Sequence, residues 1–232
     1  MVEIKGIEKF APKDYPGHIS ATLFVGGCNF RCPYCHNSDL VLRAESLPSF
    51  PVEYLIGFLD SRKDWLDGIC VSGGEPLIHQ DLDVLLSLIK ERNLRIKIDT
   101  NGSHPCRLKR LIREGLLDCV AMDVKAPLNR YAEVVRADVS PEDIIESVDM
   151  IKRSGLEYLF RTTVVPGLVG ADDILEMSQM LKGAKLFQIQ QFVPTNTLDG
   201  DYLHRIPYTG EEIRLMAKIA EPFFGEVRVE GV

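Results

Sequence analysis

Three cysteines lie close together in the chain, and thiols at this spacing can hold one soft metal centre. Cys28, Cys32 and Cys35 follow the pattern Cys-x3-Cys-x2-Cys within eight residues. A closed tetrahedral zinc site needs four ligands, and the other three cysteines are isolated in the sequence. His36 could supply a fourth ligand, although a histidine next to Cys35 usually points elsewhere. An iron–sulfur cluster with three cysteine ligands and one open iron therefore fits the pattern best.

A glycine motif further along the chain offers a place where the backbone can approach a ligand. Ser72-Gly73-Gly74-Glu75-Pro76 follows a short apolar run. Glycines permit close approach, and Glu75 adds a carboxylate that could lie near an ammonium group. A pair of glycines alone predicts only a turn. The motif indicates a ligand site only in combination with the cysteine loop that precedes it.

The elements that position these motifs alternate between β-branched runs and helical patterns. Strands are predicted at residues 20–25, 68–72, 95–99, 118–125, 158–165 and 186–192, with a last edge strand at 225–229. Helices are predicted at residues 52–62, 82–92, 106–114, 141–154, 172–181 and 210–220. Because whole helices separate the strands, the connections are crossovers and the sheet is parallel.

About six βα units are fewer than the eight of a closed barrel, so the fold is an α/β domain with either an open partial barrel or a doubly wound sheet. Ligands bind at the carboxyl ends of the strands in both cases, and the motifs follow strands. We therefore expect one site at one rim. The sequence has no linker or repeat, which predicts a single domain over residues 1–232.

Composition excludes several classes of protein. The chain has 232 residues, 45% of them hydrophobic, and a formal charge of −7, which argue against a disordered chain and against a nucleic-acid partner. No apolar run approaches the roughly 20 residues of a membrane helix, and the N-terminus lacks a signal-peptide pattern. Six cysteines without such a signal indicate thiols or metal ligands in the cytoplasm. We interpret Cys70, Cys106 and Cys119 as buried thiols.

The cysteine loop, with Tyr34 as the aromatic residue before Cys35, resembles the signature of the radical S-adenosylmethionine (SAM) superfamily. The Gly73–Gly74 motif resembles its Gly-Gly-Glu-Pro element. Over residues 14–195 the chain is most similar to the activating enzymes of glycyl-radical enzymes, and within them to anaerobic ribonucleoside-triphosphate reductase activating proteins. The stretches that carry this similarity are Asp14-Tyr15-Pro16-Gly17, Cys32-Pro33-Tyr34-Cys35-His36-Asn37, Asp99-Thr100-Asn101-Gly102, Met122-Asp123-Val124-Lys125 and Arg161.

The resemblance implies an open (β/α)6 partial barrel and a role for each matching residue. Cys28, Cys32 and Cys35 would hold a [4Fe–4S] cluster, and residues 34–36 would present backbone to the adenine of SAM. Gly73, Gly74 and Glu75 would bind its methionine and amino groups. The carboxylate of SAM would lie near Asp123, Val124, Lys125 and Arg161, and a monovalent cation near Asp99, Thr100 and Asp123.

Simpler interpretations exist for two of these residues: Asp99 could form a turn at a strand end, and Lys125 could be solvated. On the sixth strand some relatives carry a histidine, whereas this chain has Gln190 and Gln191. Neighbours on a strand face opposite sides, so only one of the two can face the site.

The activity implied is reductive cleavage of SAM and abstraction of a glycine Cα hydrogen from a partner enzyme under strictly anaerobic conditions. The partner would be an anaerobic ribonucleotide reductase, and a low-potential donor such as flavodoxin or ferredoxin would supply the electron. One alternative is an enzyme for a small molecule that resembles 7-carboxy-7-deazaguanine synthase, in which aspartate follows the last cluster cysteine instead of His36. The other is a metal-binding scaffold without catalysis.

The C-terminal stretch Arg228-Val229-Glu230-Gly231 resembles the segment in which glycyl-radical enzymes carry their radical. A stable glycyl radical needs a sheltered pocket, whereas chain ends are commonly mobile. We therefore expect residues 225–229 to form an edge strand and Gly231 not to be a substrate.

Overall fold

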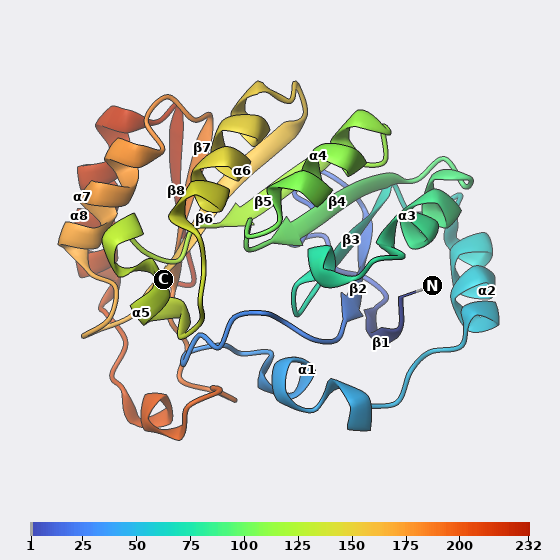
Figure 1. Cartoon of the computed structure of the whole chain (residues 1–232), viewed down its shortest axis with the longest axis horizontal. Coiled ribbons are helices and arrows are strands. Elements are labelled where there is room, and N and C mark those ends of the chain that lie inside the picture. The colour runs from blue at the N-terminus through green and yellow to red at the C-terminus, as the bar shows by residue number, and fades with distance from the viewer. Residues whose placement is uncertain (1) are drawn as a thin grey trace.

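The computed structural model describes residues 2–232, in which eight strands form one curved sheet (Figure 1). The order in the sheet is the order in the chain, and β1 is antiparallel to β2 while every other neighbouring pair is parallel. The strands are β1 (Ile4–Glu8), β2 (Ser20–Val25), β3 (Gly68–Gly73), β4 (Arg95–Thr100), β5 (Cys119–Asp123), β6 (Glu157–Val164), β7 (Leu186–Gln191) and β8 (Glu226–Glu230).

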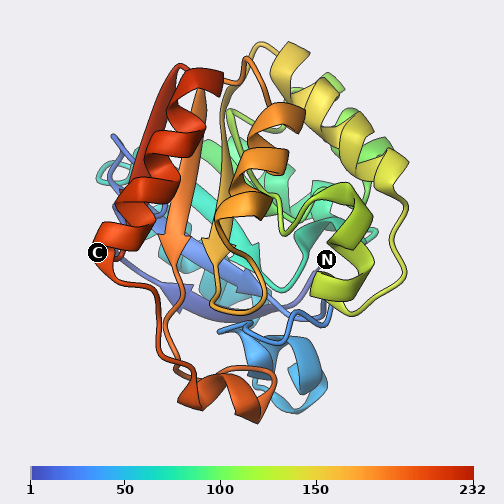
Figure 2. The ribbon, with the colours of Figure 1, turned by 90° about the vertical axis from the view of Figure 1, so that its left-hand side faces the viewer.

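The longer helices that connect the parallel strands lie along the outside of the curved sheet, whereas the short helix α1 lies apart from it (Figure 1, Figure 2). A doubly wound sheet reverses its strand order, and this sheet does not. Its two end strands, β1 and β8, do not pair with each other in the described part of the chain, so the barrel stays open as predicted. The helices are α1 (Ser38–Leu42), α2 (Val52–Arg62), α3 (Leu82–Lys90), α4 (Pro105–Arg113), α5 (Tyr131–Val135), α6 (Pro141–Arg153), α7 (Ala171–Met180) and α8 (Gly210–Ala220).

Helix α6 illustrates how local sequence forms these elements. The Ser140 side chain accepts a hydrogen bond from Asp143 N at 3.2 Å, and Pro141 occupies the first turn, where no backbone donor is needed. Ile144, Val148 and Ile151 recur on one face and are buried. The predicted helix at 141–154 is confirmed to within one residue.

Three elements were not predicted. Strand β1 is short and contains Gly6, which weakens the β pattern. Helices α1 and α5 span five residues each, too few to show a helical period. Strand β8 lies one residue later than the predicted 225–229, and it pairs in parallel with β7.

The two faces of the sheet differ in polarity. Phe160, Phe187 and Ile189 point toward the helices and are fully buried. The inner face carries ionised side chains near the carboxyl ends of the strands, above a small apolar group formed by Tyr15, Cys119, Ala121 and Leu159. In residues 2–232, no helix is long and apolar enough to cross a membrane. The cytoplasmic location stays a prediction.

Candidate active site

A cavity of about 240 Å³ opens at the carboxyl ends of the parallel strands. It brings together the cysteine loop after β2, the glycine motif after β3, and charged residues from β4, β5 and β6. Val124 does not line it, because the side chain is buried in the core and its N–H donates to Arg161 O at 2.8 Å. The predicted residues that line the cavity are Cys28, Cys32, Tyr34, Cys35, His36, Gly73, Gly74, Glu75, Asp99, Thr100, Asp123, Lys125 and Arg161.

The cysteine loop places three thiols on this cavity. A turn in which Cys35 N donates to Cys32 O at 3.1 Å shapes the loop, and Arg31 N bonds to Val135 O at 2.8 Å. Burial raises the pKa of Cys28 to about 11 and that of Cys32 to about 12, and it also raises the pKa of Cys35. The metal-free thiols are therefore protonated near neutral pH, and metal binding must release protons.

The three thiols of the described loop are not arranged around a single metal ion. In the described chain, no three His, Cys, Asp or Glu side chains lie close enough to share one metal ion. Sulfurs around one tetrahedral zinc would be about 3.8 Å apart, given a Zn–S bond of about 2.3 Å. In an iron–sulfur cluster each thiolate binds a different iron, so the sulfurs can be further apart. The loop thus suits the predicted cluster.

The other cysteines lie apart from this loop. Cys70 and Cys119 are buried on β3 and β5, as predicted. Cys106 is exposed on α4, so the prediction of a buried thiol is wrong for it. The reason is the helical period, which turns Leu108 and Leu111 toward the core and leaves Cys106 outside.

The two glycine-containing motifs touch each other through their backbones. Gly74 N donates to Val25 O at 2.9 Å, and Glu75 N donates to Gly27 O at 2.8 Å. A Cβ on Gly74 would lie 1.7 Å from Gly27 O, and Gly73 has a φ of +119°. These glycines are therefore needed for the motifs to pack together, in addition to any approach of a ligand.

Glu75 is held inside the protein. Its carboxylate is 1% exposed and accepts hydrogen bonds from Leu77 N at 3.0 Å, Thr100 Oγ1 at 2.7 Å and Asn101 N at 2.6 Å. Burial raises the pKa of Glu75 to about 7, although these hydrogen bonds oppose the shift. The side chain fixes the turn after β4 rather than lying free beside an ammonium group.

We expect Glu75 to make the free energy of unfolding of the cluster-free protein depend on pH. Its pKa in the folded state is about 7, above the ordinary value of 4.5, so the folded state binds more protons between these pH values and the free energy of unfolding falls as the pH rises. This contribution is complete below pH 4.5 and lost above about 7. Urea unfolding across this range should show a flatter pH dependence in Glu75→Gln.

The matched control is Glu176→Gln, on the exposed side of α7, which should keep the slope of the wild type. Equal slopes in the wild type and Glu75→Gln would contradict the prediction.

A charge row runs along the inner face of the sheet from β4 to the end of β5, and every member except Lys97 lines the cavity. Lys97 pairs with Asp99, and Arg161 Nη1 lies 3.2 Å from Asp99 Oδ2. Arg161 Nε lies 2.8 Å from Asp123 Oδ1, and Lys125 Nζ lies 3.1 Å from Asp123 Oδ2. The row arises because Asp123 and Arg161 are register partners on β5 and β6, while Lys97 and Asp99 share one face of β4.

Charges in this row are stabilised by their neighbours. Burial disfavours the ionised form of Asp123, but Arg161 and Lys125 outweigh it and hold the pKa of Asp123 well below its usual value. Burial likewise opposes ionisation of Arg161, and Asp123 and Asp99 raise its pKa. All members of the row are therefore charged at neutral pH.

The sixth parallel strand resolves the choice between the two glutamines. Gln190 lines the cavity and donates to Glu230 Oε2 at 3.0 Å. Gln191 faces the other side, where it donates to Tyr208 O. Gln190 is thus the residue of β7 that can contact a ligand.

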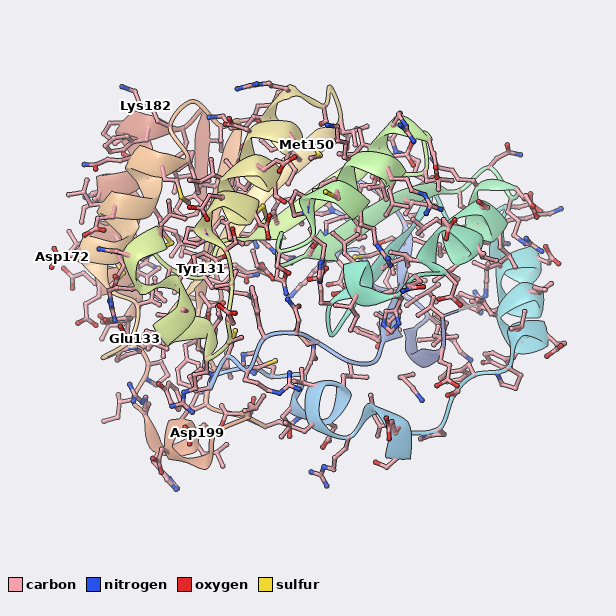
Figure 3. All side chains as sticks on the ribbon, in the orientation of Figure 1. Tyr131, Glu133, Met150, Asp172, Lys182 and Asp199 are labelled. Carbon is pink, nitrogen blue, oxygen red and sulfur yellow. The ribbon has the colours of Figure 1, made fainter. Side chains whose placement is uncertain are left out.

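Residues 192–199, after β7, hold the end of the cysteine loop in place. Asn196 Nδ2 donates to His36 O at 3.0 Å, and Asp199 N donates to Pro33 O at 2.9 Å. Asp199, labelled in Figure 3, also pairs with Arg136 at 2.7 Å. Sequence reasoning missed these contacts because the segment carries no motif. It also missed Lys97, whose signal is a lysine between two buried isoleucines.

Comparison with known proteins agrees with this geometry. The model of the Radical SAM superfamily matches residues 22–181. The chain belongs to the radical SAM superfamily. A Methanocaldococcus jannaschii protein named as a glycyl-radical enzyme activating enzyme is 34% identical over 99% of this chain and 96% of its own length. The pyruvate formate-lyase-activating enzyme of Streptococcus mutans is 28% identical over 91% of this chain and 84% of its own length.

Within the superfamily, the chain belongs to the family of glycyl-radical enzyme activating enzymes. This confirms the resemblance predicted from the sequence. The crystal structure of Streptococcus suis SuiB shares the fold, with a TM-score of 0.67, 15% identity and coverage of 89% of this chain. This chain spans 47% of the SuiB chain. Membership implies a radical SAM enzyme with a [4Fe–4S] cluster and SAM as cofactors.

Proposed function

We propose that this radical SAM enzyme activates a partner by abstracting a Cα hydrogen from one of its glycines, and that the partner is an anaerobic ribonucleotide reductase. The observation that carries the proposal is the juxtaposition, in one cavity, of the cysteine loop, the glycine motif and the charge row. The relationship to activating enzymes over nearly the whole chain supports it. Specific similarity at residues 14–17 and 32–37 supports the choice of partner.

When bound, the cluster and SAM would supply the chemistry, a one-electron reductive cleavage of SAM to methionine and a 5′-deoxyadenosyl radical. The protein positions these groups. In this proposal Cys28, Cys32 and Cys35 hold the cluster, residues 34–36 present backbone to adenine, and Gly73 and Gly74 lie along the methionine.

The charge row is the proposed site for the carboxylate of SAM. Three cationic side chains face only two carboxylates, so the row can accept one further anion. Lys125 and Arg161 would contact it directly. We also propose a monovalent cation near Asp99, Thr100 and Asp123. Both carboxylates already bind Arg161, so the cation would share these oxygens with the guanidinium.

Two further parts of the proposal concern organisation and electron supply. The continuous sheet supports a single radical SAM domain over residues 1–232. A low-potential donor such as flavodoxin or ferredoxin would reduce the cluster. The main competing function, an enzyme for a small molecule, predicts that SAM is consumed with that molecule and that no protein radical forms.

Electron paramagnetic resonance on the reconstituted enzyme tests the proposal. With SAM and a reductant alone we expect no persistent glycyl radical, and with an anaerobic ribonucleotide reductase we expect its characteristic doublet. If no glycyl-radical enzyme yields a radical, while the enzyme cleaves SAM, the activating function is wrong.

Gly231 is the internal control. It lies in the left-handed region with φ +84°, next to Gln191 and at the end of the exposed edge strand β8. A doublet seen without a partner and absent from Gly231→Ala would show that the enzyme acts on itself.

A further inference from the structure

Tyr34 carries a buried hydroxyl that has nothing to bind in the protein. The side chain is 3% exposed and lines the cavity, and Tyr34 Oη has no hydrogen-bond partner within residues 2–232. Buried hydroxyl groups are rarely left unpaired, because losing water without gaining a partner is unfavourable. The phenol therefore indicates a partner that becomes available only when the site is occupied.

The nearby protein groups are already engaged. Tyr131, at the start of α5 (Figure 3), accepts a hydrogen bond from Lys125 N at 3.3 Å, and its hydroxyl lies 3.5 Å from Asp123 O. Lys125 Nζ pairs with Asp123. These residues and Cys32 are the groups that act electrostatically on Tyr34. Asp123 and Tyr131 already have donors and lysine offers no acceptor, so the sulfur of Cys32 is the acceptor among these groups that has no donor.

The three cluster cysteines differ in whether a protein group donates a hydrogen bond to the sulfur. Cys28 Sγ accepts a hydrogen bond from Phe30 N at 3.4 Å, and the backbone of Asn37 lowers the pKa of Cys35 against the effect of burial. Cys32 is the most buried of the three, and no group in the described chain donates to its sulfur. An unpaired donor and an unpaired acceptor thus face the same cavity.

We propose that Tyr34 donates a hydrogen bond to the thiolate of Cys32 when the cluster is bound, and that this bond makes the cluster easier to reduce. Thiolate formation gives the sulfur the negative charge that a phenol can bind. Hydrogen bonds to the sulfurs of a cluster stabilise its reduced, more negative form and so raise the reduction potential. The inference rests on the cluster of the proposed function, and it assigns Tyr34 a side-chain role beside the proposed backbone contact with adenine.

The test is a redox titration of reconstituted Tyr34→Phe without SAM. We expect wild-type iron and sulfide content but a lower midpoint potential. The matched control is Tyr131→Phe, an equally buried phenol whose hydroxyl is already paired; its midpoint should equal that of the wild type.

Electron–nuclear double resonance of the reduced cluster in H2O and D2O gives a second readout on the folded wild type. We expect an exchangeable proton coupled to the cluster that Tyr34→Phe lacks. An unchanged midpoint and unchanged proton coupling would overturn the inference, as would a loss of SAM affinity alone, which would assign the hydroxyl to SAM. Failure of the wild type to bind iron would instead contradict the proposed function.

Discussion

Alanine at position 28, 32 or 35 is expected to abolish cleavage of SAM. Each of these thiols would hold one iron of the cluster, and a loop with two thiols leaves a second iron without a protein ligand. We expect iron and sulfide content to fall and the production of 5′-deoxyadenosine to become undetectable, a loss of several orders of magnitude. Anaerobic reconstitution, metal analysis and chromatography of the products measure these quantities.

The remaining cysteines provide matched controls in the same chain. Cys106→Ala changes an exposed thiol on α4, and Cys119→Ala changes a buried thiol on the inner face of β5. Cys70→Ala removes the sulfur that lies 3.6 Å from Lys97 Nζ. We expect all three proteins to retain iron near the level of the wild type. Loss of the cluster in Cys106→Ala would show that the ligands are assigned wrongly.

Most of the fold was predictable because strong periodic segments determine it. The run that forms β2 is short and mostly apolar, the run that forms α6 has a period of about 3.6 residues, and their positions agree with the structure. Strand β1 was not predictable, because its five residues become a strand only by pairing with β2. The distinction between a partial barrel and a doubly wound sheet depends on strand order, which the local pattern does not contain.

Site residues that belong to a sequence motif were predictable. Site residues that are placed by tertiary contacts were not. The cysteine and glycine motifs identified most of the cavity lining. Their backbone contact at Gly27 and Gly74, and the burial of Glu75, arise from two loops meeting in space. Asn196 could not be found from sequence, because its role depends on residues 192–199 lying against the cysteine loop. Gln190 was one of two candidates until the strand register separated them.

Lys125→Ala and Arg161→Ala are expected to weaken SAM binding without loss of the cluster, and to differ from each other in stability. A hydrogen bond to a charged group contributes about 1.5–3 kcal/mol, so removing either contact with the carboxylate should raise the dissociation constant about 10- to 150-fold. Equilibrium binding of SAM to the reconstituted variants measures this. Unchanged affinity in both would exclude them from the site.

Repeating the titration with potassium and with tetramethylammonium also tests the proposed cation.

Arg161→Ala should in addition unfold more easily than Lys125→Ala. Arg161 bonds to both Asp99 and Asp123, and its side chain is 14% exposed, so its removal leaves two poorly solvated carboxylates with one lysine each. Breaking a buried pair in this way costs about 3–5 kcal/mol. Lys125→Ala leaves Asp123 paired with Arg161, so the loss should be smaller. Arg153→Ala, which breaks a pair whose arginine is 80% exposed, should change the free energy of unfolding by at most about 1 kcal/mol. Urea unfolding of the cluster-free proteins separates these cases, and equal stability of Arg161→Ala and Arg153→Ala would mean that the charge row does not support the fold.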